Sequence, residues 1–303
     1  MERSSTSTNP NSGDSRLGPS LPHRRSLAAR RATFLLLAAP FFIACDPALP
    51  ENGSEEPDAE AAEEAFPGRS GETQTALLVT EEGTTPITYQ LIDGYMVHEG
   101  DILLGEQGGS YTAQSATLRT TTWPGCVIPY AIDPRLPNPE RVTSAIAHWQ
   151  SKTAVRFVKR TSQADYVLFA NDGKGCYSWI GRKGGAQTVS LADGCSTGSA
   201  IHEIGHAVGL FHEQSRQDRD SYVTVLWDNI QAGKESNFNK YRSASGRDVG
   251  TFDFSSIMIY GGKFFSKNGK PTLVHKDGTP LSNQRSTLSA GDLGGIARLC
   301  GSP

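Results

Sequence analysis

Three histidines and a glutamate lie within one short stretch, HEIGHAVGLFHE, which starts at His202. His202 and His206 are four residues apart, so on a helix both imidazoles project from one face toward a single ion. Gly209 permits the left-handed turn that ends a helix, and the returning chain can deliver His212 to the same point. Three nitrogen ligands leave a fourth position open, which is typical of a catalytic rather than a structural zinc site.

Glu203 follows the first of these histidines, where its carboxylate can contact water on the ion without binding the ion itself. Zinc lowers the pKa of bound water toward ~7, and Glu203 can take that proton and pass it to a leaving amine. The pattern predicts peptide hydrolysis with one catalytic Zn²⁺. The alternatives are helix histidines that only make core hydrogen bonds, and a closed structural zinc site, for which the local sequence offers no fourth Cys or His.

The elements that must position these residues begin near Trp123. Strands are expected at CVIPYAI, VRFVKR and YVLFA, and on both sides of the Gly-rich turn in GCYSWIGRKGGAQTVSL. ERVTSAIAHWQSKT predicts an amphipathic helix with Val142, Ile146 and Trp149 on one face. TGSAIHEIGHAVGLFHE predicts a buried helix with Gly209 near its end, and loops with short helical pieces follow to Pro303. This order of elements indicates an α+β domain.

The histidine motif is the HExxHxxGxxH pattern of metzincin peptidases, and its continuation HEQSRQDRDSY resembles the astacin subfamily. The resemblance extends over about Trp123 to Cys300 and includes WPGCVIPY, KTAVRFVKRT, GCYSWIGR and SLADGC. It implies a zinc endopeptidase that acts on proteins or peptides. It also implies two lobes, with the zinc helix at the floor of the cleft between a twisted mixed sheet and a mostly irregular lower lobe.

The resemblance assigns roles to residues beyond the histidine motif. SSIMIY is similar to the Met-turn of the family, with Met258 beneath the zinc site. Tyr260 is implied to lie near the zinc as an extra ligand or as a hydrogen-bond donor in the transition state. Ile259 stands where the family usually has His. Glu213 is implied to receive the N-terminus freed by processing, which is a structural role.

Five cysteines are present, and the four from Cys126 onward allow three pairings. The resemblance implies that Cys176 pairs with Cys195. The longer disulfide of the family normally starts at the position of Ala154, so Cys126 is expected to substitute for it and to pair with Cys300.

The fifth cysteine, Cys45, ends the apolar run FLLLAAPFFIAC, which is preceded by several arginines. A run of about 12 residues is too short to span a bilayer, which needs roughly 20, but it suits a signal peptide. The run resembles a bacterial lipoprotein signal in which Cys45 carries the lipid, and a plain cleaved signal is the alternative. We therefore expect a bacterial protein that is exported, as a cell-envelope lipoprotein or in secreted form, with membrane contact only through the lipid.

The segment before the catalytic domain contains His98-Glu99-Gly100-Asp101, which is similar to the FxGD motif of astacin propeptides. That resemblance makes Asp101 a latency switch at the open zinc position, whereas the local sequence alone equally predicts a Gly-Asp turn between two strands. Activation would then need cleavage between Asp101 and Trp123, for which the stretch around Arg119 is suitable. The expected organisation is a signal peptide (1–45), an acidic disordered linker (46–75), a propeptide-like segment (76–120) and an astacin-like catalytic domain (121–303).

The composition argues against nucleic acid as a partner, but it does not decide between an enzyme and a binding protein. The net charge of −3 offers no basic excess for nucleic acid, and we expect a monomer with protein or peptide substrates. A catalytically silent surface binding module, or an envelope protein that zinc only braces, remains an alternative because a fold does not guarantee a function. The presence of Glu203 beside all three histidines favours the enzyme.

Overall fold

The computed structural model describes residues 64–80, 83–107, 117–119, 121–241 and 246–302. The predicted signal peptide, Cys45 and most of the predicted linker lie outside these residues. Within the described ranges, no helix has both the length and the apolar character needed to cross a membrane.

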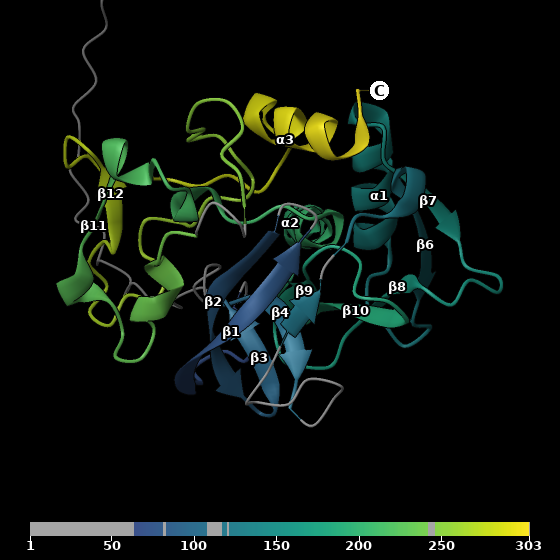
Figure 1. Ribbon diagram of the computed structural model, residues 1–303, viewed down its shortest axis with the longest axis horizontal. Helices are drawn as coiled ribbons and strands as arrows, with labels where there is room; N and C mark the ends of the chain where they lie inside the picture. The colour runs from purple at the N-terminus through teal and green to yellow at the C-terminus, as the bar shows by residue number, and fades with distance from the viewer. Residues whose placement is uncertain (1–63, 81–82, 108–116, 120, 242–245, 303) are drawn as a thin grey trace, which may run out of the picture. The chain divides into compact units, whose positions relative to one another are not determined.

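Ten strands form one mixed sheet in the order β5-β1-β2-β3-β4-β9-β10-β8-β6-β7 (Figure 1). The pairs β4·β9, β10·β8, β6·β8, β6·β7 and β1·β5 are parallel, and the remaining pairs are antiparallel. The strands are Glu72–Thr80 (β1), Gly83–Ile92 (β2), Tyr95–His98 (β3), Ile102–Glu106 (β4), Thr117–Arg119 (β5), Val127–Ile132 (β6), Arg156–Lys159 (β7), Tyr166–Ala170 (β8), Cys176–Trp179 (β9) and Ala186–Leu191 (β10).

Two helices pack together beside this sheet, α1 (Glu140–Lys152) and α2 (Thr197–Val208). The face of α1 that the sequence predicts as apolar is buried, including Val142 and Trp149. The indole Nε1 of Trp149 donates to the Ile201 carbonyl at 3.1 Å, which ties α1 to α2. The helix that carries the histidine motif is therefore held at a fixed place against the sheet.

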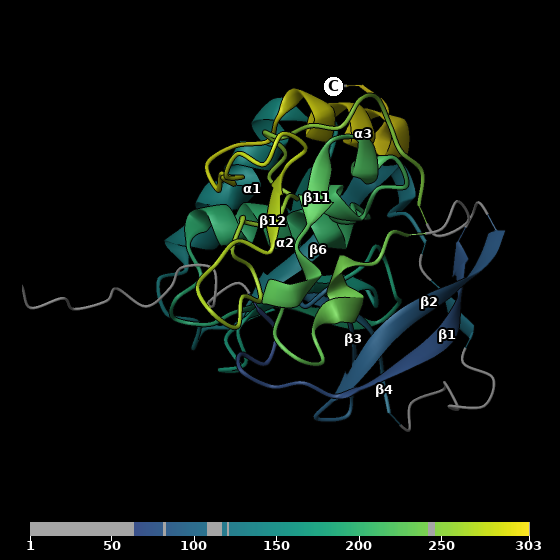
Figure 2. The same ribbon diagram turned by 90° about the vertical axis from the view of Figure 1, so that its left-hand side faces the viewer.

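The chain after α2 is mostly irregular, as predicted, and contains short 3₁₀ turns, a two-stranded sheet and one further helix (Figures 1 and 2). The helix, α3, is longer than the short pieces expected. Its start has a capping box in which Ser289 and Asp292 bond each other's backbone N–H groups, a pattern that the sequence SAGD contains. The elements after α2 are Glu213–Ser215 (η3), Arg219–Ser221 (η4), Val223–Val225 (β11), Trp227–Asn229 (η5), Glu235–Phe238 (η6), Leu273–His275 (β12) and Ala290–Cys300 (α3), and one earlier 3₁₀ turn, Pro124–Cys126 (η2), precedes β6.

Residues 64–107, called here the N-terminal segment, extend the sheet of the domain that follows, with β4 beside β9 (Figure 1). The junction is the parallel pairing of Ile102 with Ser178 and of Leu103 with Trp179. Packed structure also occurs before the expected linker boundary at residue 75, since Ala65 is fully buried and β1 begins at Glu72. The segment contributes most of two apolar clusters, which Ile180 of the domain completes in one case and Tyr177 and Trp179 complete in the other.

Both predicted disulfides are present in the structure. Cys126 pairs with Cys300, and Cys176 pairs with Cys195. The first joins the turn before β6 to the last residue of α3, and so connects the two ends of the domain. Two disulfides fit an oxidising compartment outside the cytosol.

Candidate metal centre and active site

The helix α2 is defined at both ends by residues that the sequence marks as helix boundaries. At its start, Ser196 and Ser199 form a capping box, with each hydroxyl accepting the other's backbone N–H at 3.0 Å. At its end, Gly209 has a φ of 125°, a conformation that a residue with a Cβ rarely adopts. The chain turns back there, so that the ring centroids of His212 and His206 lie 4.7 Å apart.

Two of the histidines are oriented by carbonyl groups of the domain itself. The Nδ1 atom of His202 lies 2.7 Å from the Ile257 carbonyl, and that of His206 lies 2.8 Å from the Leu210 carbonyl. A carbonyl only accepts, so each Nδ1 must carry the proton and each Nε2 presents a lone pair when the ring is neutral. Fixing the outer nitrogen of a histidine in this way is how metal ligands are commonly oriented.

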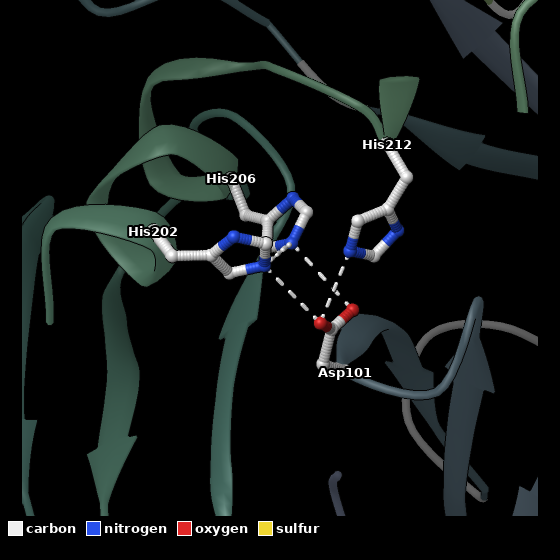
Figure 3. A group of neighbouring side chains, drawn as sticks. All are labelled: Asp101, His202, His206 and His212. Atoms are coloured by element: carbon white, nitrogen blue, oxygen red, sulfur yellow. Dashed lines mark hydrogen bonds and ion pairs between the residues drawn. The ribbon is translucent and has the colours of Figure 1, made fainter. Parts of the chain in front are cut away.

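Asp101 of the N-terminal segment enters the space between the three rings (Figure 3). Its Oδ2 lies 3.3 Å from Nε2 of His202 and 3.1 Å from Nε2 of His212, and its Oδ1 lies 3.5 Å from Nε2 of His206. The four candidate ligand atoms lie within 4.8 Å of one another, and all four residues are buried. Asp101 was predicted to reach this point, and the structure places it there.

The donor set fits a metal ion better than it fits hydrogen bonds alone. The Nε2 atoms of His202 and His206 are 3.1 Å apart, and burial lowers the pKa of His202 to about 3, so that ring is neutral at physiological pH. The Nε2 atoms of both rings face the Asp101 carboxylate, whose Oδ1 accepts no hydrogen bond from the described residues. A cation between them satisfies all of these atoms, and imidazole with carboxylate is a ligand set that Zn²⁺ accepts.

The third histidine has its outer partner in the N-terminal segment and not in the domain. Nδ1 of His212 lies 2.9 Å from Oε2 of Glu99, whose other oxygen lies 3.3 Å from Nε2 of His98. Burial opposes a charged ring, but the carboxylates of Asp101 and Glu99 raise the pKa of His212 to about 9. Glu99 had no predicted role, although an acidic residue two positions from a proposed ligand is a pattern that could have indicated one.

Glu203 is fully buried on α2, directly after His202. Met258 lies under the same helix, because a Cβ added to Gly205 would be only 2.6 Å from the Met258 sulfur. The backbone carbonyl of Met258 also accepts the N–H of Glu213 at 3.0 Å, which links this turn to the end of the histidine motif.

Tyr260 lies beside the third histidine, with ring centroids 4.6 Å apart. Its hydroxyl donates to the Glu99 carbonyl at 2.5 Å, so the N-terminal segment occupies the hydrogen-bonding capacity of this group. Ile259, where the resemblance leads one to expect His, is fully buried in the apolar cluster that also contains Tyr260. The substitution is accommodated by packing and leaves the three metal-facing histidines in place.

Glu213 lies at the wall of a cavity of about 440 Å³, which is also lined by Thr121, Arg216 and Asp292. Its Oε1 accepts the backbone N–H of Asp253 at 2.7 Å and lies 3.5 Å from the Arg216 guanidinium. Burial raises the pKa of Glu213 to about 7. An additional positive charge in the cavity would therefore be stabilised by this carboxylate.

A profile of one peptidase family, described as Astacin, matches residues 115–299, which is more than half of the chain. The chain belongs to the astacin family. The match begins after the N-terminal segment and includes all three histidines, Met258 and Tyr260.

Individual astacins and related proteases resemble the chain over the same region. This chain is 40% identical over 203 residues to the zinc metalloproteinase nas-15 of Caenorhabditis elegans. The matched region covers 65% of this chain and 35% of nas-15. It is 39% identical over 219 residues to nas-4 of the same organism, covering 68% of this chain and 69% of nas-4. The chain thus spans about a third of nas-15 and about two thirds of nas-4.

A solved zinc-protease structure agrees with the fold. High choriolytic enzyme 1, a hatching enzyme zinc-protease from the medaka fish Oryzias latipes, superposes with a TM-score of 0.55 at 35% identity. The superposition covers 61% of this chain and 94% of that enzyme. The predicted astacin-like α+β fold, with its mixed sheet and active-site helix, is confirmed.

Proposed function

We propose that the chain is a zinc-dependent endopeptidase that is made in a latent form. The observation that carries this proposal is the convergence of three helix and turn histidines and one upstream aspartate on a single point. Proteins and peptides are the proposed substrates, and a monomer is the proposed state.

In this proposal His202, His206 and His212 hold the zinc ion. When bound, zinc would polarise a carbonyl oxygen and lower the pKa of a water molecule. Glu203, on the same helix, accepts the proton of the attacking water and delivers it to the leaving amine. Tyr260 donates a hydrogen bond to the substrate oxygen as negative charge develops there.

Latency follows in this proposal from the N-terminal segment, which places Asp101 where the substrate and water must enter. The backbone N–H of Ser178 on β9 donates to the Asp101 carbonyl at 3.0 Å, so sheet pairing holds the aspartate in position. Cleavage between Asp101 and Trp123, around Arg119, would cut the chain that tethers the segment to the domain. The new N-terminal ammonium would enter the cavity lined by Glu213 and pair with its carboxylate.

The residues before the segment are proposed to direct export. The arginine-rich start and the apolar run that ends at Cys45 support a signal peptide of the bacterial lipoprotein type, with Cys45 as the lipid attachment site. The acidic stretch that follows would then act as a tether between the envelope and the enzyme.

The test uses the full chain with the recognition sequence of a specific protease placed within residues 108–116. After cleavage and removal of the segment, the zinc-loaded chain is expected to hydrolyse denatured casein, and a chelator is expected to stop the reaction. Glu203→Ala should abolish hydrolysis and keep the zinc, while Glu140→Ala, an exposed residue of α1, should have no effect. A folded, zinc-loaded chain that cleaves neither casein nor a broad peptide library would instead support the binding-module alternative.

A further inference from the structure

Glu99 is a buried residue to which the proposed mechanism gives no role. It is only 1% exposed and lies in the turn between β3 and β4, two residues before Asp101. Its backbone φ is 46°, in the left-handed region, and that of Gly100 is 76°. Glycine adopts such a conformation freely, whereas a residue with a Cβ rarely does. The turn alone therefore does not explain a glutamate at this position, and its contacts with the rest of the molecule compensate for the backbone conformation.

The carboxylate of Glu99 lies between two histidine rings. Its Oε2 is 2.9 Å from Nδ1 of His212, and its Oε1 is 3.3 Å from Nε2 of His98. The other ring nitrogen of His98 lies 2.6 Å from the Thr88 carbonyl on β2. Tyr260 holds the backbone of the same residue, since its hydroxyl donates to the Glu99 carbonyl at 2.5 Å. Glu99 is thus fixed by His98 of the segment and by Tyr260 of the domain.

The contact with Glu99 determines how His212 faces the metal centre. Among the described residues, Glu99 is the one hydrogen-bond partner of Nδ1 in His212, and the opposite nitrogen, Nε2, faces Asp101 (Figure 3). The outer partner of a ligating histidine fixes its tautomer and ring orientation, and loss of that partner typically weakens metal binding roughly 10- to 100-fold. His202 and His206 have carbonyl partners within the domain. His212 is therefore the histidine whose orientation depends on the segment.

We propose that the N-terminal segment has a second function besides closing the site, namely zinc acquisition, and that Glu99 performs it by orienting His212 for the metal. Zinc is then bound before the segment is removed, while all three histidines have their outer partners. His98 is the positioning residue for Glu99. The coupling is reciprocal, so that zinc strengthens the binding of the segment to the domain by the factor by which the segment strengthens zinc binding. This inference rests on the zinc site of the proposed function and not on peptide hydrolysis.

Zinc titration of metal-free protein against a chromophoric chelator tests the inference. Three forms are compared, which are the uncleaved chain, the uncleaved Glu99→Gln chain, and the cleaved chain after removal of the segment. The unchanged uncleaved chain is expected to bind zinc at least about 10-fold more tightly than either of the other two. Glu106→Gln, at the exposed end of β4, is the matched control and should bind zinc as the unchanged chain does.

A second substitution separates this role from that of Asp101. In an Asp101→Ala chain, which lacks the aspartate at the metal centre, Glu99→Gln should still weaken zinc binding about 10-fold, because it acts through His212. His98→Phe keeps a buried ring but removes the nitrogen that faces Glu99, so it should weaken zinc binding as well. With Co²⁺ in place of zinc, the visible absorption spectrum should change in Glu99→Gln and not in Glu106→Gln, because only the former alters the orientation of a ligand.

Equal zinc affinities of the cleaved and uncleaved chains would overturn the inference. A Glu99→Gln chain that binds zinc as tightly as its parent, with and without Asp101, would overturn it too. If Glu99→Gln does not fold, the same titration of His98→Phe decides. A chain that shows the expected zinc affinities but hydrolyses no peptide would contradict the proposed function and still support the inference.

Discussion

The domain and the N-terminal segment both contribute to the metal centre, but they do so in different ways. The domain orients His202 and His206 with its own carbonyl groups, at 2.7 and 2.8 Å. The segment supplies two carboxylates, namely Asp101 at the centre and Glu99 behind His212. Without the segment, His202 and His206 would keep their outer partners and His212 would lose its partner. The comparison shows that the domain orients two of the three histidines by itself, while carboxylates from upstream of the domain complete the charge of the site.

The largest expected effect comes from removing a ligand that the domain holds. His206→Ala should release zinc and reduce peptide hydrolysis to background in the cleaved chain, because two protein nitrogens do not complete the site. Zinc content by mass spectrometry and the rate on casein measure both effects. His275→Gln, on β12, removes a histidine outside the centre and should change neither. Full zinc occupancy in His206→Ala would show that the domain does not build the site in the way described.

A smaller effect is expected where Met258 supports α2. Gly205→Ala places a Cβ 2.6 Å from the Met258 sulfur, so the free energy of unfolding should fall by about 1–3 kcal/mol. Urea denaturation should show this loss equally in the cleaved and uncleaved chains, because the contact lies within the domain. The matched control is Gly294→Ala on α3, where nothing lies within 4 Å and stability should rise slightly. Equal stability of both alanine variants would contradict the described packing.

The smallest effect concerns the carboxylate behind His212. Glu99→Gln keeps an acceptor for Nδ1 but removes its charge, and charge-assisted hydrogen bonds are roughly twice as strong as neutral ones. The excised segment carrying this change should inhibit the cleaved wild-type chain about 10-fold more weakly, which corresponds to ~1.4 kcal/mol. Glu106→Gln, at the exposed end of β4, should inhibit as the unchanged segment does. An unchanged inhibition constant for Glu99→Gln would assign all of the latency to Asp101.

Sequence patterns predicted the parts of the site that depend on local spacing. The helical interval between His202 and His206, the turn at Gly209 and the apolar face of α1 follow from a few neighbouring residues, and the structure contains all of them. The disulfide pairs and Asp101 required the family resemblance, because residues far apart in the chain carry no local indication that they meet.

The remaining features depend on contacts between distant segments. The addition of β4 to β9 could not be predicted, because strand pairing at that range is set by the whole sheet. The pairing of Glu64 with Lys234 is equally non-local, and the acidic composition around Glu64 predicted a disordered linker instead. Charged residues were assigned to solvent by composition, whereas in the structure they are buried because each compensates the other.

The closure of the metal centre by Asp101 is tested most directly by the activity of the uncleaved Asp101→Ala chain on a small fluorogenic peptide, with zinc present. We expect the uncleaved wild-type chain to be silent and Asp101→Ala to be active without cleavage, because the fourth position at the metal is then open. Asp93→Ala, in the exposed turn between β2 and β3, should remain silent. An uncleaved Asp101→Ala chain that binds zinc and stays as inactive as the wild type would contradict the claim that this aspartate closes the site.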